Sequence, residues 1–499
     1  MKRKAGILLN VSSFPGNYGV GGFSCNAEYF LNEFAGMGFS LWQTLPITAV
    51  GGGYSPYSGI SSYAGNYLYI DPERLDNLVT KAELNERVYK GGIYLTDYPY
   101  ALKVKGELLR IAYSRITPEI VAKVEEFCAE NAYWVYDYAV YMTLKESFGG
   151  APWTEWGEYA DYSKKLVERI RTKRAEEVGF YLFEQYCFYK QWNKLKKHAN
   201  DLGIEVFGDL PIYVSLDSVD VWANSKAFLL DEKHKPTAVA GVPPDYFSKD
   251  GQLWGNPLYD YEQMAKDDYK WWTDRICHAL KLYDVVRIDH FRGLYEYWEV
   301  PQDAVTAKEG RWRKGPQKAL FDALEKIKPN AKIVAEDLGI IDENVEEFLE
   351  SCGFPGMRVM QFGFDGDKNN KHLPHNYVKN CFAYTATHDN DTTLGWLLSL
   401  DTATLKNALN YVNCDSSFGW ADGAGQCRST KAFVRAVMQS VANVAIVPMQ
   451  DLCGYGSDTR MNTPGQAENC WRYRTNYSAL ADVDNAFVRN LIATYGRLR

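Results

Sequence analysis

Val285-Val286-Arg287-Ile288-Asp289 is a short apolar run that ends in a carboxylate. Side chains alternate along a β-strand, so Arg287 and Asp289 would point to one side, and Val286 and Ile288 to the other. If the two apolar side chains pack against outer helices, Arg287 and Asp289 point into the mouth of a barrel. A guanidinium fixed beside a carboxylate favours the ionised carboxylate, which a nucleophile requires. A purely structural Arg–Asp pair would leave the same pattern.

Seven other segments share the character of this one. Each is a short apolar or β-branched run that ends in polar or turn residues, and most are nearly continuous, as expected of parallel strands covered on both faces. Helical patterns, such as residues 316–327 and 344–352, lie between several of them. The eight predicted strands are residues 6–11, 40–47, 205–214, 285–291, 332–337, 358–364, 382–388 and 444–450. This alternation, with a count of eight, predicts an α/β fold of the (β/α)8 barrel type.

The uneven spacing of the strands predicts where the barrel carries insertions. We expect a single catalytic barrel over residues 1–499. Residues 49–204 lie between the second and third strands and read mostly as helices with a 3.6-residue apolar period, which predicts a helical insertion subdomain. A second insertion, residues 215–283, contains the turn-rich aromatic run 241–261. No β-rich domain is predicted after the eighth strand.

The composition argues against several classes of partner. The chain carries 63 acidic and 55 basic residues, a formal net charge of −8, and no long basic run, so nucleic acid and anionic membranes are not expected partners. No segment approaches the roughly 20 apolar residues of a membrane span. The ten cysteines show no zinc-ligand spacing, and the apolar run after the basic N-terminus is too short for a signal peptide. We predict a cytoplasmic protein with reduced thiols and no obligate protein partner.

Aromatic residues are abundant, with 36 Tyr, 23 Phe and 14 Trp making up 15% of the chain. A large core with many surface tyrosines would explain this content. A sugar-binding groove would explain it equally well, because rings stack on pyranose faces while Tyr and Trp polar groups meet hydroxyls. Composition alone leaves both interpretations open.

Carboxylates follow several predicted strands, at the end of the barrel where such folds place their chemistry. They are Asp209, Asp289, Glu336, Asp337, Asp389 and Asp451. A single strand-end Asp is often only a helix N-cap, but capping is a poorer explanation for a whole set at one rim. Glycoside chemistry needs one ionised and one protonated carboxyl, and Glu336 has the longer reach that suits a proton donor. Asp389 would then be a third acid, fit to hold sugar hydroxyls.

The sequence predicts no metal ion and no cofactor. Residues 365–376 begin like a calcium loop, but Asn370 replaces the required glycine and Asn376 the final glutamate. His372 and His375 are interpreted as loop residues rather than as metal ligands. The GxGxxG, Walker and GxSxG motifs are missing from the sequence, so dinucleotide, phosphate and serine-hydrolase chemistry have no support.

A series of short motifs runs through nearly the whole chain. They include Gly6-Ile-Leu-Leu-Asn10, Leu41-Trp-Gln-Thr-Leu-Pro46, Ser55-Pro-Tyr-Ser58, Phe207-Gly-Asp-Leu-Pro211, Gly251-Gln-Leu-Trp-Gly-Asn-Pro257, Arg287-Ile-Asp-His-Phe-Arg-Gly293, Glu336-Asp-Leu-Gly339, Thr387-His-Asp-Asn-Asp-Thr392 and Arg460-Met-Asn-Thr-Pro-Gly465. Any one is a weak signal, but together and in this order they resemble the amylomaltases, the 4-α-glucanotransferases of glycoside hydrolase family 77. The chain departs from the family at Asn10-Val11-Ser12, where His-Pro-Thr is usual, and at the glycine run 51–53.

The resemblance implies roles for particular residues. Asp289 would be the nucleophile, Glu336 the general acid/base and Asp389 the stabiliser of the transition state. The remaining substrate-binding residues would be Tyr57, Asp209, Arg287, His388 and Asn462 around the −1 subsite, with Tyr246, Phe247 and Trp254 on the acceptor side.

The resemblance also implies an activity without a cofactor. A retaining 4-α-glucanotransferase would move α-1,4-glucan segments from a malto-oligosaccharide or starch donor to the 4-OH of an acceptor glucan or glucose, through a covalent glucosyl-Asp intermediate. Two alternatives stay open at this point. An α-amylase-type hydrolase would use the same chemistry on a related barrel, and a non-catalytic barrel would only bind α-glucans.

Overall fold

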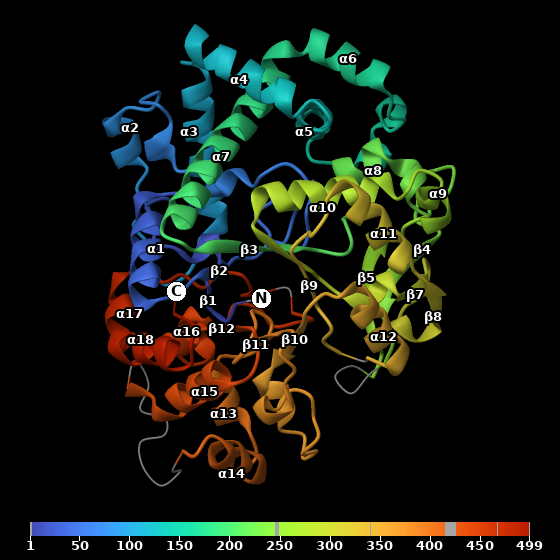
Figure 1. Cartoon of the computed structure of the whole chain (residues 1–499). Helices are drawn as coiled ribbons and strands as arrows, with labels where there is room; N and C mark the ends of the chain where they lie inside the picture. The colour runs from blue at the N-terminus through green and yellow to red at the C-terminus, as the bar shows by residue number, and fades with distance from the viewer. Residues whose placement is uncertain (1, 245–248, 340, 415–425, 467, 499) are drawn as a thin grey trace.

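A nearly closed ring of eight parallel strands lies at the centre of the molecule (Figure 1). The structure, a computed structural model, describes residues 2–244, 249–339, 341–414, 426–466 and 468–498. The strands follow the order β10-β11-β12-β1-β2-β3-β6-β9. They are β1 (Lys4–Leu8), β2 (Leu41–Gln43), β3 (Glu205–Leu210), β6 (Val285–Ile288), β9 (Ile333–Ala335), β10 (Gly356–Val359), β11 (Cys381–Tyr384) and β12 (Val444–Pro448). The eight predicted strands and the (β/α)8 barrel are therefore confirmed.

Hydrogen bonds across the remaining gap complete the barrel between β9 and β10. The Ala335 N–H donates to the Pro355 carbonyl over 2.9 Å, and the Met357 N–H donates to Asp337 Oδ1 over 2.6 Å. Side chains fill the interior, where the rings of Phe207 on β3 and Phe382 on β11 lie 5.2 Å apart. The barrel is therefore a packed core with its polar groups gathered at the ends of the strands.

Helices cover the outside of the barrel, as the alternation of the sequence predicts. The apolar positions of α11 (Lys318–Ile327) recur at helical spacing, so Leu320, Phe321 and Leu324 are buried while its lysines stay in solvent. The other helices outside the connection between β2 and β3 are α1 (Cys25–Met37), α8 (Val219–Ala223), α9 (Tyr261–Ala265), α10 (Lys270–Leu282), α12 (Glu343–Cys352), α13 (Thr393–Ser399), α14 (Thr402–Tyr411), α15 (Arg428–Gln439), α16 (Met449–Cys453), α17 (Tyr477–Asp482) and α18 (Asn485–Thr494).

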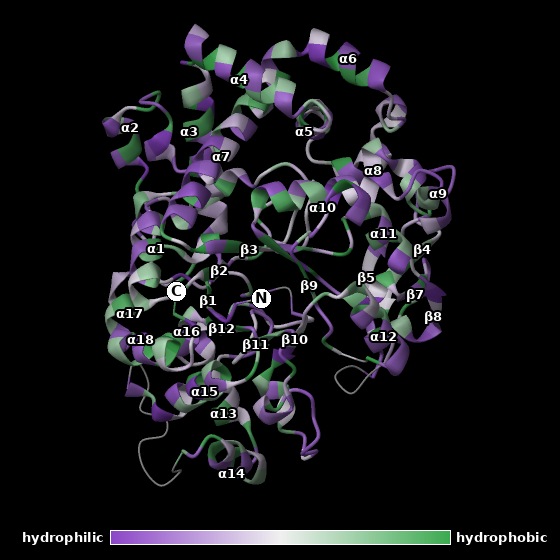
Figure 2. Ribbon diagram, viewed as in Figure 1, coloured by the Kyte–Doolittle hydropathy of each residue, from purple (hydrophilic) through white to green (hydrophobic). Residues whose placement is uncertain are grey.

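Six helices form the connection between β2 and β3. They are α2 (Lys81–Glu86), α3 (Tyr98–Tyr113), α4 (Pro118–Glu130), α5 (Val135–Ser147), α6 (Lys164–Lys173) and α7 (Ala175–Asp201). Helices α4, α5 and α6 project beyond the barrel at the top of Figure 1, and α6 shows both polar and apolar residues in Figure 2. His278 on α10 ties this region to the barrel, because its two ring nitrogens lie 2.7 Å from the hydroxyls of Tyr133 and Tyr189.

A four-stranded antiparallel sheet, which the sequence did not reveal, packs beside the barrel. Its strands are β4 (Ala238–Val242), β5 (Gln252–Pro257), β7 (Glu296–Pro301) and β8 (Arg311–Lys314), in the order β5-β4-β7-β8. The first two come from the connection between β3 and β6, and the last two from the connection between β6 and β9. This inserted sheet therefore joins chain segments on both sides of β6 (Figure 1).

The end of the chain closes the amino-terminal face of the barrel. The Arg497 side chain is fully buried and donates only to backbone carbonyls among its described contacts, those of Lys4, Met438, Ser440, Ala442 and Asn443. These carbonyls belong to the start of β1, to the end of α15 and to the turn that leads from α15 into β12. The described residues after β12 form helices and no further strand. No described helix has the length and apolarity needed to cross a membrane.

Candidate active site

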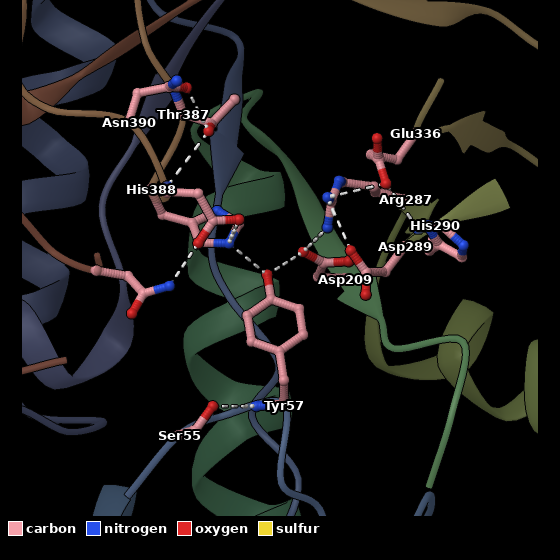
Figure 3. A network of polar contacts seen from close by, with 12 residues as sticks. Ser55, Tyr57, Asp209, Arg287, Asp289, His290, Glu336, Thr387, His388 and Asn390 are labelled. Carbon is pink, nitrogen blue, oxygen red and sulfur yellow. Dashed lines mark hydrogen bonds and ion pairs between the residues drawn. The ribbon is translucent and has the colours of Figure 1, made fainter. Parts of the chain in front are cut away.

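A network of polar side chains lies at the carboxyl ends of the barrel strands (Figure 3). Asp209 is the penultimate residue of β3, Asp289 follows β6 directly, and Glu336 follows β9. β3 pairs with β6 in a register that places Asp209 opposite Arg287. Because side chains alternate along β6, Arg287 and Asp289 lie on the same side of the barrel wall as Asp209 on β3.

Arg287 holds three carboxylates together. Its guanidinium donates to Asp209 Oδ2 over 2.6 Å and to Asp289 Oδ1 over 2.9 Å, and the second of these nitrogens lies 4.0 Å from Glu336 Oε2. Burial alone would lower the pKa of Arg287, but Asp209 and Asp289 hold this pKa well above its ordinary value. The Asp209 side chain is 0% exposed. Asp209 is therefore placed behind the site, where it fixes Arg287, while Asp289 is open to the barrel mouth.

Glu336 accepts two backbone hydrogen bonds and is nevertheless a weak acid. The His290 N–H donates to Oε2 over 2.8 Å, and the Leu338 N–H donates to Oε1 over 2.7 Å. Burial raises the pKa of Glu336 to about 7, against the lowering effect of Arg287 and with a further raising effect of Asp289. A carboxyl with this pKa can both give and take a proton near neutral pH.

Asp389 lies in the opposite electrostatic environment. Its carboxylate accepts from Asn462 Nδ2 over 2.6 Å and lies 3.2 Å from His388 Nε2. Burial alone would raise the pKa of Asp389, but His388, Asn462 and Arg287 together hold this pKa below its usual range. The site thus contains one carboxyl poised to be protonated and another held ionised.

Tyr57 connects the two halves of the network (Figure 3). Its hydroxyl donates to Asp209 Oδ2 over 2.7 Å and lies 2.8 Å from His388 Nε2. Burial and the charge of Asp209 raise the pKa of Tyr57 well above its ordinary value, so the hydroxyl keeps its single proton. Since the Tyr57 hydroxyl donates its hydrogen bond to Asp209, its oxygen accepts a hydrogen bond from His388. This arrangement requires a proton on His388 Nε2.

Two aromatic residues frame this arrangement. The Tyr57 ring stacks on His388 with centroids 5.4 Å apart and an interplanar angle of 15°. Trp471 packs against both rings at 5.7 and 6.0 Å and adopts a left-handed backbone conformation with φ of 65°. Trp471 was not among the predicted site residues, because a Trp in a loop outside the motifs carries no local signal.

Trp254 on β5 is the described member of the three aromatic residues expected on the acceptor side. Its ring meets the His290 ring edge to face, with centroids 5.0 Å apart and an angle of 84°, and it is 37% exposed. The inserted sheet therefore reaches the residue that follows Asp289. Tyr246 and Phe247 lie outside the described residues.

The other acids of the rim have structural partners. Asp337 forms an ion pair with Arg358 over 2.8 Å. Asp451 accepts hydrogen bonds from the hydroxyls of Thr385 and Thr393 and from the Thr393 N–H, over 2.6 to 2.7 Å. Both side chains are buried and linked to neighbouring strands or helices. They stabilise the barrel and take no place in the network around Arg287.

The described residues contain no group of three or more His, Cys, Asp or Glu side chains placed to hold a metal ion. His372, one of the two histidines considered in the sequence, accepts the Val359 N–H at Nδ1 over 3.1 Å. The Tyr411 hydroxyl lies 2.8 Å from Nδ1 of the other, His375. Both side chains thus contribute to local loop structure.

Comparisons with known proteins agree with one another over nearly the whole chain. A family model described as 4-alpha-glucanotransferase matches residues 9–479. A 4-alpha-glucanotransferase of Aquifex aeolicus is 41% identical over 500 residues, covering 99% of both chains, and one of Thermus thermophilus is 39% identical over 510 residues, covering 100% of both. The solved structure of an amylomaltase from Streptococcus agalactiae in complex with acarbose matches with a TM-score of 0.94 and 35% identity over 100% of both chains.

Proposed function

The chain belongs to the 4-α-glucanotransferase family, glycoside hydrolase family 77, and from this premise we propose that it transfers α-1,4-glucan segments with retention of anomeric configuration. The donor is a malto-oligosaccharide or starch chain, and the acceptor is the 4-OH of a second glucan or of glucose. Asp289 is the nucleophile, Glu336 the general acid/base and Asp389 the stabiliser of the transition state. No cofactor takes part in this scheme.

The position of Arg287 between two carboxyls carries the proposal. One guanidinium nitrogen lies 2.9 Å from Asp289 Oδ1 and 4.0 Å from Glu336 Oε2, so these oxygens are at most about 7 Å apart. Retaining glycosidases place their two carboxyls about 5 to 5.5 Å apart, whereas inverting enzymes need about 6.5 to 9.5 Å to admit a water molecule. The upper limit set by Arg287 excludes most of the inverting range and thus supports attack by Asp289 itself.

In the first half-reaction, Glu336 protonates the glycosidic oxygen while Asp289 attacks the anomeric carbon. The bond to the leaving glucan breaks, and a glucosyl ester forms on Asp289. The pKa of Glu336 near 7 supports its role as proton donor, and the ion pair with Arg287 supports an ionised nucleophile. In the second half-reaction, the deprotonated Glu336 takes the proton of the acceptor 4-OH, which attacks the ester and restores both carboxyls.

Three residues around Asp389 hold the sugar during these steps. The lowered pKa of Asp389 keeps a negative charge beside the developing oxocarbenium ion. The same carboxylate accepts hydrogen bonds from hydroxyl groups of the sugar. Asn462 and His388 fix its two oxygens. Tyr57 stacks on the sugar of the −1 subsite, and Asp209 acts through Tyr57 and Arg287 from its buried position. Trp254, Tyr246 and Phe247 line the acceptor side in this proposal.

Incubation with maltotriose tests transfer against its alternatives. A transferase produces a ladder of longer chains together with glucose, whereas an α-amylase-type hydrolase only shortens the substrate. A non-catalytic glucan-binding barrel leaves maltotriose unchanged. Product analysis by chromatography distinguishes the three outcomes, and only the ladder supports the proposal.

We also propose that one catalytic barrel spans residues 1–499, with a helical insertion at 49–204 and an acceptor-side insertion at 215–283. The connection that holds α2 to α7 and the connection that holds β4 and β5 support these two insertions. We further propose a cytoplasmic enzyme that binds α-glucans without an obligate protein partner.

A further inference from the structure

The turn after β6 has a strained conformation at the residue next to Asp289. His290 has φ of 45° and ψ of 51°, in the left-handed region that non-glycine residues seldom adopt. In this conformation its N–H donates to Glu336 Oε2, and its carbonyl accepts the Gly293 N–H over 2.9 Å. The strain therefore serves to aim one backbone donor at the carboxyl of Glu336.

The side chain of His290 is confined between the barrel and the inserted sheet. A Cβ atom at Gly293 would lie 3.0 Å from His290 Cδ2 and 2.6 Å from Ile212 Cδ1, so the turn has no space for a larger residue. On another side the ring meets Trp254 edge to face. Burial lowers the pKa of His290 to about 4, so the imidazole is neutral near pH 7 and packs as an aromatic ring.

Trp254 is the exposed end of this chain of contacts. It lies on β5, more than a third of its surface is accessible, and among the described residues its ring also contacts Tyr213 at a centroid distance of 6.1 Å. Trp254 contacts both Tyr213 and His290, so a sugar that packs on its accessible surface would contact the same ring that packs on His290. The contact between Trp254 and His290 therefore connects a surface that a sugar can reach with the backbone of the turn after β6.

We propose that His290 is a positioning residue that couples Trp254 to Glu336, so that packing against Trp254 fixes the backbone N–H that holds the acid/base carboxyl. The inference rests on the proposed role of Glu336 and adds a residue to it. Among the described residues, the charged groups that act on Glu336 are Arg287 and Asp289, and neither changes in this coupling. The Leu338 N–H holds the other carboxyl oxygen independently of Trp254.

The direction of the expected effect follows from the hydrogen bond. A donor to a carboxylate favours the charged form, so a weaker His290 N–H bond raises the pKa of Glu336. The acid then stays protonated to higher pH. The basic limb of the pH profile of kcat/KM for maltotriose should therefore move upward when the Trp254–His290 contact is lost.

Two substitutions remove the contact from opposite sides. Trp254→Ala removes the indole, and His290→Asn removes the imidazole but keeps a residue that tolerates the left-handed conformation. Each should move the basic limb upward by about 0.5 to 1 pH unit, and the double variant should move it no further than the larger single effect. Leu253→Ala is the matched control, because Leu253 is an exposed neighbour on β5. It should leave the basic limb in place.

His290→Val tests the backbone conformation directly, because a β-branched residue disfavours the left-handed region. It should move the limb at least as far as His290→Asn. If Trp254→Ala and His290→Asn both retain the wild-type limb, or if their shifts add in the double variant, the coupling is overturned. This test requires that the wild-type protein makes longer glucan chains from maltotriose. If the wild-type protein makes none, the proposed function is contradicted instead of the coupling.

Discussion

Two buried arginines occupy opposite ends of the barrel and have opposite surroundings. Arg287, at the carboxyl ends of the strands, contacts the side chains of Asp209 and Asp289. Arg497, at the amino ends, donates to five backbone carbonyls and meets no carboxylate among its described partners. Burial and the charge of Arg3 lower the pKa of Arg497 to about 9, whereas the acids around Arg287 raise the pKa of that residue.

The difference separates stability from chemistry in this fold. Backbone carbonyls are fixed by the strands and turns, so Arg497 joins the first strand, the last strand and the C-terminus into one unit. Carboxylates can exchange protons or act as nucleophiles, so Arg287 controls the charge of the reactive carboxylates beside it. This matches the general division of (β/α)8 barrels between a stabilising face and a catalytic face.

Asp289→Asn should have the largest effect on activity. It removes the nucleophile while keeping the shape of the side chain, so transfer from maltotriose should fall by at least about 10⁴-fold. The unfolding free energy in urea should change by less than about 1 kcal/mol, since the side chain is partly open to solvent. A residual rate within 100-fold of wild type would show that another group attacks the sugar.

Arg287→Lys should have the next largest effect. Lysine keeps the positive charge but cannot contact Asp209 and Asp289 with a planar fork, so kcat should fall by about 10² to 10³-fold. Arg497→Lys is the control at the other end of the barrel, and its kcat at 25 °C should equal that of wild type. Equal losses of kcat in both variants would contradict the division between the two faces.

Arg497→Met should act on stability alone. It leaves several buried carbonyls without their donor, so the unfolding free energy should fall by about 2 kcal/mol, roughly 30-fold in the folding equilibrium. Urea titration followed by circular dichroism measures the change. The rate per folded molecule should stay at the wild-type value, and a lowered rate in the absence of denaturant would mean that the amino-terminal face also shapes the site.

Raising the pH should have the smallest effect, a decrease of kcat/KM by about tenfold per pH unit above the pKa of Glu336. Because Glu336 must be protonated for the first half-reaction and has a pKa of about 7, kcat/KM should decline above that pH. The fold favours the protonated form, so the unfolded chain releases this proton first. Stability should therefore fall as the pH rises from the ordinary pKa of about 4.5 towards 7.

Glu336→Gln serves as the matched variant for this prediction. It cannot ionise, so it should be more stable than wild type above pH 7 although nearly inactive. Thermal unfolding at pH 5 and pH 8 gives the comparison. Identical stabilities of the two proteins at pH 8 would mean that Glu336 titrates near its ordinary value in the fold.

The sequence predicts the barrel well because its strands are nearly continuous apolar runs. The alternation of Val286, Arg287, Ile288 and Asp289 also placed the charged pair on one side, as the register between β3 and β6 confirms. In both cases the information is local, since a few consecutive residues carry the period and the burial of a strand.

Contacts between distant segments could not be read in this way. β4 and β5 contain Gly241, Gly255 and Pro257, and they complete their sheet only with strands that follow β6. Asp451 follows a strand as the reactive acids do, but Thr385 and Thr393, more than fifty positions earlier in the chain, donate hydrogen bonds to it. The sequence supplies the residue types at the rim, but only the packed structure separates reactive acids from structural ones.

The inserted sheet also has a consequence for the order of folding. Its two hairpins stand on either side of β6 in the chain, so the pairing of β4 with β7 closes a loop around the strand that precedes Asp289. The pairing of Ala238 with Pro301 spans fewer positions than the pairing of Phe207 with Val285 that brings β6 into the barrel, so loop closure favours the inserted sheet at least as much. Trp254 should therefore meet His290 as soon as β6 joins the barrel, and a partly folded chain would contain its nucleophile together with its acceptor side.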